Sequence, residues 1–131
     1  MDIKPGTYSI KCVGYLTQVA TAPASGDRVV GQKERELDTQ YWEVEENGQY
    51  NTIRNVGTGR YLAVDGDSAV LGENPEDWDV TLENQGRFKV AAVGDGRALY
   101  LTGGKDGSPV ELANYTGAKP QQWYFQSRDN D

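Results

Sequence analysis

The 131-residue sequence contains no histidine and has a single cysteine. Without histidine the chain lacks the commonest general base and the commonest metal ligand, so Ser-His-Asp and Cys-His catalysis and histidine-ligated metals are excluded. A lone cysteine forms neither an internal disulfide nor a zinc site. The carboxylate groups Asp65/Asp67 and Glu76/Asp77/Asp79 lie in turn-like segments, where acidic residues commonly shape the backbone. We therefore predict a protein that is not an enzyme and uses no metal and no cofactor.

Positive charge and long apolar runs are also scarce. Lys and Arg number 13 against 20 Asp and Glu, which leaves a net charge of −7 and no basic stripe for nucleic acid. No segment approaches the roughly 20 apolar residues of a membrane span. The first residues, 1–6, lack the apolar segment of a secretory signal, and an unpaired thiol suits a reducing compartment. We expect no nucleic-acid binding, no membrane insertion and a cytoplasmic location.

Glycine, by contrast, is abundant, with 16 residues, and it separates short alternating runs. Tyr8, Ile10 and Cys12 alternate with more polar neighbours, as strand residues do. No window of 11 or more residues carries the apolar stripe of a helix. This pattern predicts an all-β protein built from many short strands.

A pattern of four short strands occurs three times along the chain. The first strand of each copy ends in Val-Gly, and the fourth begins with one of the three tryptophans. In the first copy the second strand is assigned to Thr17-Gln18-Val19, with its register left open. The aligned segments are 7–14, 50–57 and 87–94, then 17–19, 62–64 and 99–101, then 30–32, 71–73 and 112–114, and finally 42–44, 78–80 and 123–125.

Three copies of four strands predict a pseudo-threefold β-trefoil, which we prefer to a non-repeating β-sandwich. The strands should form a six-strand barrel with a hairpin cap, and the loops at its rims are the expected binding surface. Each tryptophan N–H should reach a backbone carbonyl in the core. The core residues expected are Ile10, Ile53, Val90, Trp42, Trp78 and Trp123. The repeats span approximately residues 5–47, 48–85 and 86–127 of one domain, 1–131.

Two Gln-x-Trp motifs and two longer segments indicate which class of β-trefoil the chain resembles. Gln40-Tyr41-Trp42 and Gln121-Gln122-Trp123 have the form Gln-x-Trp, and the second repeat has Glu76-Asp77-Trp78 instead. With residues 5–10 and 53–62, the chain resembles the ricin B-like β-trefoil lectins of mushrooms over nearly its whole length. The resemblance implies a fungal, carbohydrate-binding trefoil whose partner is a glycan or glycoprotein. Related lectins dimerise, so a homodimer stays open.

The resemblance also implies where a sugar would bind, and this chain departs from that pattern. Such lectins use an aspartate in the second strand, where the matching residues here are Gln18 (or Thr17), Ala63 and Tyr100. The aromatic platform after the third strand is matched by the small residues Gly31, Gly72 and Ala113. These departures weaken galactose-type binding at the usual pockets.

Other polar residues of the same loops remain candidates for a sugar site. Gly31-Gln32 has the Gly-polar form found in the mushroom branch, and Gln18 can exchange hydrogen bonds with a hydroxyl, although less strongly than a carboxylate. The alternative for each residue is an ordinary solvated loop position. The predicted carbohydrate-binding residues are Gln18, Gly31, Gln32 and Asp38 in the first repeat and Asp106, Asn114, Tyr115 and Thr116 in the third.

A second function is compatible with the fold, because mushroom β-trefoil protease inhibitors share it. The longest loop of small and polar residues, 21–29, contains Asp27-Arg28-Val29. Arg28 would suit the acidic specificity pocket of a trypsin-like protease, with Arg28–Val29 as the reactive bond. Gly26 softens this loop, which costs affinity through ordering entropy. A trefoil that recognises another protein is the third option.

Overall fold

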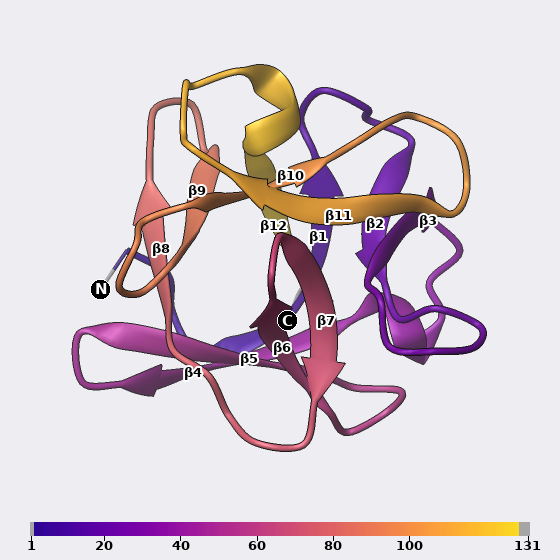
Figure 1. The fold of residues 1–131 in the computed structure, drawn as a ribbon, viewed down its shortest axis with the longest axis horizontal. Helices are drawn as coiled ribbons and strands as arrows, with labels where there is room; N and C mark the ends of the chain where they lie inside the picture. Colours follow the sequence, from indigo (N-terminus) through magenta and orange to yellow (C-terminus); the bar gives the residue numbers. More distant parts are fainter. Residues whose placement is uncertain (1, 129–131) are drawn as a thin grey trace.

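The computed structural model describes residues 2–128. This part of the chain forms twelve strands and two 3-10 helices, η1 and η2 (Figure 1). It contains no helix that is long and apolar enough to cross a membrane. The elements are β1 (Gly6–Cys12), β2 (Gln18–Thr21), β3 (Val30–Lys33), η1 (Asp38–Gln40), β4 (Trp42–Asn47), β5 (Tyr50–Asn55), β6 (Tyr61–Asp65), β7 (Ser68–Gly72), β8 (Trp78–Leu82), β9 (Phe88–Ala92), β10 (Ala98–Leu101), β11 (Ser108–Ala113), η2 (Lys119–Gln121) and β12 (Trp123–Ser127).

Six of the strands close into an antiparallel barrel. β1 pairs with β4, β4 with β5, β5 with β8, β8 with β9, β9 with β12, and β12 with β1. The other six strands form the hairpins β2–β3, β6–β7 and β10–β11, which pair with one another through β3–β11 and β7–β11 (Figure 1). A six-strand barrel with three capping hairpins is a β-trefoil, which confirms the predicted fold class.

The three tryptophans occupy equivalent core positions. Trp42, Trp78 and Trp123 are 1%, 0% and 1% exposed, and Ile10, Ile53 and Val90 are buried with them. Their indole Nε1 atoms donate to the backbone oxygens of Ala20 (3.0 Å), Leu62 (2.9 Å) and Leu99 (3.1 Å). Each bond satisfies a donor that would otherwise be buried without a partner, so each fourth strand is tied to its own second strand.

These bonds decide the register that the sequence left open. Because Ala20 holds the place of Leu62 and Leu99, the segment that matches Leu62-Ala63-Val64 is Ala20-Thr21-Ala22. The assignment of Thr17-Gln18-Val19 to this strand position is therefore wrong by three residues. The acceptor position of the first repeat is held by Thr21, and Gln18 lies at the start of β2.

The third strand of the first repeat is also displaced from its predicted alignment, by one residue. Ala20 faces Gly31, whereas Leu62 faces Leu71 and Leu99 faces Leu112. Gly31 thus occupies the position of Leu71 and Leu112. The residue that corresponds to Gly72 and Ala113 is therefore Gln32. A Cβ at Gly31 would lie 2.7 Å from Leu101 Cδ1, so a neighbouring leucine already fills the space that a side chain there would need.

Candidate functional site

Aspartates on the three hairpin turns contact the first part of the neighbouring repeat. Arg60 Nη1 donates to Asp27 Oδ1 at 2.7 Å, Arg97 Nη1 donates to Asp67 Oδ1 at 2.6 Å, and Gln18 Nε2 donates to Asp106 Oδ1 at 3.2 Å. Gln18, Arg60 and Arg97 hold the same place in their repeats, one residue before Val19, Tyr61 and Ala98, which pair with the first strands. The structure therefore brings together two predicted site residues from different repeats, Gln18 and Asp106, in a contact that joins repeats.

The Asp106 cluster consists of Gln18, Lys33, Arg35 and Asp106. Asp106 Oδ1 accepts a hydrogen bond from Lys33 N at 2.8 Å, and Arg35 Nη2 lies 3.7 Å from Oδ2. The Lys33 N–H and then the Gln18 amide hold the pKa of Asp106 below its usual value. Gln18 is buried, and its Oε1 has no hydrogen-bond partner. The Asp106 side chain is half exposed, so its carboxylate joins two repeats and still reaches solvent.

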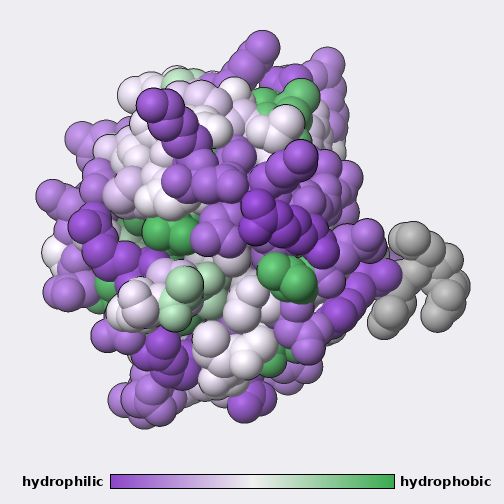
Figure 2. Space-filling view, turned by 90° about the vertical axis from the view of Figure 1, so that its right-hand side faces the viewer, coloured by the Kyte–Doolittle hydropathy of each residue, from purple (hydrophilic) through white to green (hydrophobic). Residues whose placement is uncertain are grey.

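Gly31, Gln32 and Asp38 do not complete one site with this cluster. Gly31 is buried, and its backbone oxygen accepts from Gly107 N at 2.8 Å, so the prediction that it contacts a ligand is wrong. Gln32 is half-buried in β3. Asp38 lies at η1, where it accepts from Arg128 Nη2 at 2.7 Å. The surface around hairpin β2–β3 is largely hydrophilic, with small separate hydrophobic areas (Figure 2).

The glutamines of the two Gln-x-Trp motifs fix the loops that precede them. Gln121 Nε2 donates to Asn114 O at 2.8 Å, while its Oε1 accepts from Thr116 N at 2.8 Å and from Thr116 Oγ1 at 3.1 Å. Gln40 holds Lys33 O (3.0 Å) and Arg35 N (2.7 Å) in the same way. Both glutamines are buried. Their function is therefore structural, and in the third repeat Gln121 holds the loop Asn114–Thr116 in place.

Tyr115 is at the centre of a second cluster, which we call the Tyr115 cluster: Glu83, Lys89, Tyr115 and Gln122. The Tyr115 hydroxyl donates to Glu83 Oε1 at 3.0 Å and accepts from Gln122 Nε2 at 3.3 Å. Lys89 Nζ lies 5.2 Å from the centre of the tyrosine ring. Burial, and then the nearby Glu83 carboxylate, raise the pKa of the Tyr115 hydroxyl, which therefore stays protonated at neutral pH.

The neighbouring Arg87 completes this region. Its Nη1 donates to Gln122 Oε1 at 3.5 Å, and its Nε is buried without a hydrogen-bond partner. The sequence pointed to Tyr115 and its loop but missed Glu83, Lys89 and Gln122. Glu83 and Lys89 belong to the β8–β9 hairpin, more than 25 positions away, and no sequence pattern connects that hairpin with the loop before η2.

The positions at which the family resemblance implies a carboxylate are occupied otherwise. With the observed register they are Thr21, Ala63 and Tyr100. Thr21 is buried and its hydroxyl donates to Val19 O at 3.0 Å, and Tyr100 donates to Glu111 Oε1 at 3.1 Å. Within residues 2–128, no three His, Cys, Asp or Glu side chains are grouped so that they could hold a metal ion.

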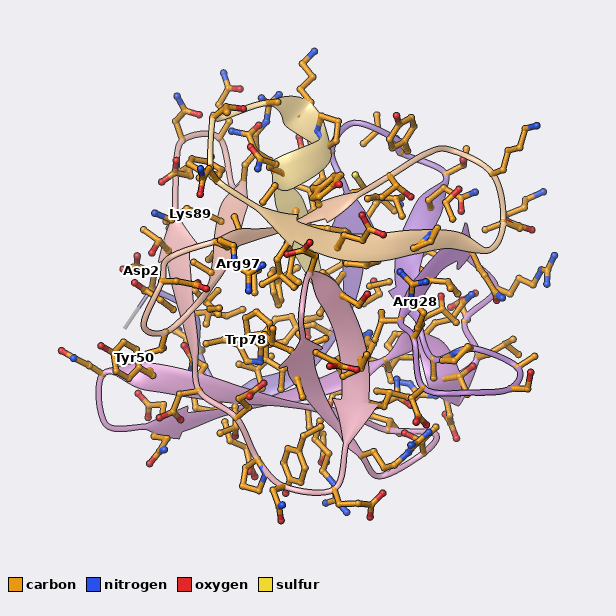
Figure 3. The ribbon with its side chains drawn as sticks, viewed as in Figure 1. Asp2, Arg28, Tyr50, Trp78, Lys89 and Arg97 are labelled. Carbon is orange, nitrogen blue, oxygen red and sulfur yellow. The ribbon has the colours of Figure 1, made fainter. Side chains whose placement is uncertain are left out.

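Residues 24–28 of the predicted protease-binding loop are exposed, but its end, Arg28-Val29, is bonded to the cap. Arg28 Nη2 donates to Ser68 Oγ (3.0 Å) and to Glu111 Oε2 (3.1 Å), and its backbone pairs with Val70 (Figure 3). Val29 is 0% exposed, and its N and O are bonded to Ala69 and Val110. A reactive bond must enter a protease cleft in an exposed loop, so the assignment of the reactive bond to Arg28–Val29 is wrong.

The six-strand barrel and its three capping hairpins define the protein as a β-trefoil. Residues 38–112 match the model of the family described as ricin-type beta-trefoil lectin domain-like, and the chain belongs to this family. No curated protein matches the sequence.

Solved structures with the same fold include several fungal lectins. The chain is similar to the Macrolepiota procera ricin B-like lectin in complex with lactose, with 22% identity, a TM-score of 0.90, and coverage of 97% of this chain and 99% of the other. The Rhizoctonia solani agglutinin is 23% identical, with a TM-score of 0.85 and coverage of 98% of this chain and 99% of the other. The Polyporus squamosus lectin bound to the epitope Neu5Aca2-6Galb1-4GlcNAc is 22% identical, with a TM-score of 0.82 and coverage of 97% of this chain and 50% of the other.

Proposed function

We propose that this protein binds carbohydrate without modifying it and that the Tyr115 cluster is its principal sugar site. The observation that carries the site is the convergence of an aromatic ring, a carboxylate, an amide and an ammonium group where the end of the second repeat meets the third. Membership of the ricin-type family supports the class of ligand.

A sugar ring offers hydroxyls around its edge and apolar C–H groups on its faces, and the Tyr115 cluster matches both. Glu83 is acceptor-only when ionised, and a carboxylate gives the stronger, charge-assisted bonds to hydroxyls. Gln122 is buried and its amide already bonds the Tyr115 hydroxyl and Arg87, so it orients the tyrosine, and Lys89 supplies a donor. The Tyr115 ring supplies the apolar surface.

The site is held in advance of binding. Gln121 fixes the backbone on both sides of Tyr115, and the Tyr115 hydroxyl is fixed by Glu83 and Gln122. Groups that are ordered before binding lose little entropy when a ligand arrives. A shallow site of this kind can therefore hold a single sugar unit usefully, and the glycans in the complexes of the Macrolepiota and Polyporus lectins support galactose-containing glycans as the first probes.

A glycan array with the wild-type protein is the first experiment, followed by titration of the best glycan into variants. Tyr115→Ala should weaken binding about tenfold through loss of the ring surface and of the hydroxyl that orients Glu83. Glu83→Gln should weaken it through loss of the charged acceptor. Tyr50→Ala and Glu45→Gln remove the same groups from hairpin β4–β5, on which Figure 3 labels Tyr50, and should bind as the wild type does. Absence of any bound glycan refutes the function, whereas normal binding by both Tyr115→Ala and Glu83→Gln refutes only the site.

A further inference from the structure

A hollow of about 160 Å³ lies where the second and third repeats meet. It is bordered by the β7–β8 connection on one side and by the β9–β10 turn on the other. The residues that line it include Val64, Glu76, Asp77, Val93, Asp95 and Arg97. None of them belongs to the Tyr115 cluster or was singled out as a sugar-binding residue.

At the two corresponding junctions a 3-10 turn fills this space. In the first repeat, η1 packs on the next Val-Gly turn so closely that a Cβ at Gly57 would lie 2.7 Å from Thr39 Cγ2. In the third repeat, η2 packs in the same way, and a Cβ at Gly14 would lie 2.8 Å from Pro120 N. Backbone bonds seal both contacts, from Val56 N to Tyr41 O (2.9 Å) and from Val13 N to Gln122 O (2.9 Å).

The second repeat lacks this turn because its connection is shorter. Eleven positions separate Gly31 from Trp42 and Leu112 from Trp123, but only seven separate Leu71 from Trp78. A Cβ at Gly94, the counterpart of Gly57 and Gly14, would meet nothing within 4 Å.

Val93 shows the consequence for the surface. It is 42% exposed, whereas its counterpart Val13 is 7% exposed. Among residues 2–128, no backbone bond from Val93 N to Asp77 O matches the bonds at the other two junctions. An apolar side chain and a backbone donor thus face the hollow.

The Glu76 side chain replaces one hydrogen-bond acceptor of the missing turn, but it does not fill the space of that turn. In the first repeat, Ala22 N donates to the Thr39 carbonyl at 3.0 Å. In the second, the counterpart Val64 N donates to Glu76 Oε2 at 2.7 Å. The end of β6 is therefore satisfied by a side chain, so the trefoil is complete although the hollow is unfilled.

The charges at the hollow select the kind of turn that would fit. Arg97 is already bonded to Asp95 (2.8 Å), to Asp67 and to Gly66 O (3.0 Å), as its position between β9 and hairpin β6–β7 in Figure 3 allows. Glu76 and Asp77 form no salt bridge among the residues described; Glu76 accepts from Val64 N, and Asp77 Oδ1 accepts a hydrogen bond from Asn47 Nδ2 at 2.8 Å. The negative charge of these carboxylates is therefore not neutralised, and the rim favours a cation.

The turns that fill the other junctions differ in charge: η1 carries Asp38, and η2 carries Lys119 followed by Pro120. We propose that the hollow is a docking site for a turn of a partner protein that carries a basic residue followed by proline. The turn would occupy the space above Gly94, accept a hydrogen bond from Val93 N and pair its cation with Asp77. This inference does not rest on carbohydrate binding.

The test uses a peptide with the sequence of residues 117–122, acetylated and amidated, titrated into the ¹⁵N-labelled protein and followed by NMR. Saturable shifts should be confined to the amides of Val93, Gly94 and their neighbours. Asp77→Asn should weaken binding about twofold to fivefold, as expected for one partly exposed ion pair. The same peptide with glutamate in place of lysine is the charge-reversed control and should not bind.

Two further variants of the protein keep the test decisive. Val93→Lys places a cation at an exposed position of the hollow and should abolish the shifts, whereas Leu82→Lys, at another exposed apolar position, should leave them unchanged. A chain whose β7–β8 connection is lengthened by the four missing residues should also lose binding, because its own turn would fill the hollow. Absence of localised shifts up to about 10 mM peptide, a concentration that would detect even millimolar affinity, would overturn the proposal. So would equal shifts with the glutamate peptide or in Val93→Lys.

Discussion

The second repeat differs from the first and third in one connection, although its core position is the same. All three repeats bury a tryptophan whose indole donates to a carbonyl of the second strand. Ahead of that tryptophan, the first and third repeats have a glutamine and a 3-10 turn, and the second has Glu76 and a shorter connection. The buried tryptophan and its hydrogen bond are thus the same in all three repeats, while the loops between the strands vary and can acquire separate functions.

The largest loss of stability should come from removing the buried tryptophans, and it should be similar in all three repeats. Trp42→Ala, Trp78→Ala and Trp123→Ala should each lower the free energy of unfolding by about 3–5 kcal/mol, because each leaves a large cavity and an unpaired backbone carbonyl. Urea denaturation measures this. A much smaller loss for Trp78→Ala would break the comparison, since it would mean that the shorter connection loosens the core of the second repeat.

Exchanging glutamine and glutamate two positions before the tryptophan should change the free energy of unfolding by different amounts in the first and second repeats. Gln40→Glu replaces the amide that donates to Lys33 O with a buried carboxylate and should cost about 1–3 kcal/mol at neutral pH. Glu76→Gln keeps an acceptor for Val64 N and should cost much less. Urea denaturation at pH 7 and pH 4 tests both, and the loss in Gln40→Glu should shrink at pH 4, where a protonated carboxyl can donate. Equal losses in the two variants would contradict the different roles.

Substitution of the glycine in a Val-Gly turn should lower stability for different reasons in different repeats: side-chain size at Gly57 and backbone conformation at Gly94. Gly57→Ala should cost about 1–3 kcal/mol by overpacking against Thr39, and Gly57→Ser should cost more. Gly94 has φ +113° and open space around it, so Gly94→Ala and Gly94→Ser should cost a similar amount, about 1–2 kcal/mol, from backbone strain alone. Thermal denaturation of the four variants would detect the pattern, and a strong dependence on size at Gly94 would contradict the hollow.

The smallest effect concerns the Asp106 cluster and pH. The Lys33 N–H and the Gln18 amide lower the pKa of Asp106 in the folded state, so its contribution to stability is present above the pKa of an unfolded aspartate, about 3.9. That contribution is lost as the pH falls through the lower folded pKa. Asp106→Asn should therefore unfold more easily at pH 7 and show a shallower loss between pH 5 and about pH 2. Asp65→Asn removes an exposed carboxylate at the end of β6 as the control, and identical pH profiles for Asp106→Asn and the wild type would contradict the assignment.

Much of the fold could be predicted because the repeats constrain one another. Glycine turns, alternating residues and three aligned tryptophans were enough to define a β-trefoil and its core. The register of β2 and β3 could not be predicted, since the first repeat places Ala20 and Gly31 where the others have leucines, and only the volume of Leu101 explains that glycine.

The candidate site was predictable only in part. Tyr115 and its loop could be identified from their position before a Gln-x-Trp motif, but Glu83 and Lys89 reach that loop from another hairpin. The sequence suggested Arg28 as the specificity residue of a reactive bond; its side chain is exposed, but Val29 packs in the cap and makes the Arg28–Val29 bond inaccessible to a protease cleft. Contacts between residues far apart in the chain depend on how the hairpins close around the barrel, which local patterns do not encode.

By itself, then, the sequence determined that this is an all-β chain of three related units with a tryptophan core, no histidine chemistry and a net charge of −7. Only the tertiary structure decided which loops face one another: it brought Gln18 to Asp106, Tyr115 to Glu83, and left the space above Gly94 open. The physical reason is that periodicity records which side of a strand is buried, whereas binding surfaces arise where strands from different repeats meet.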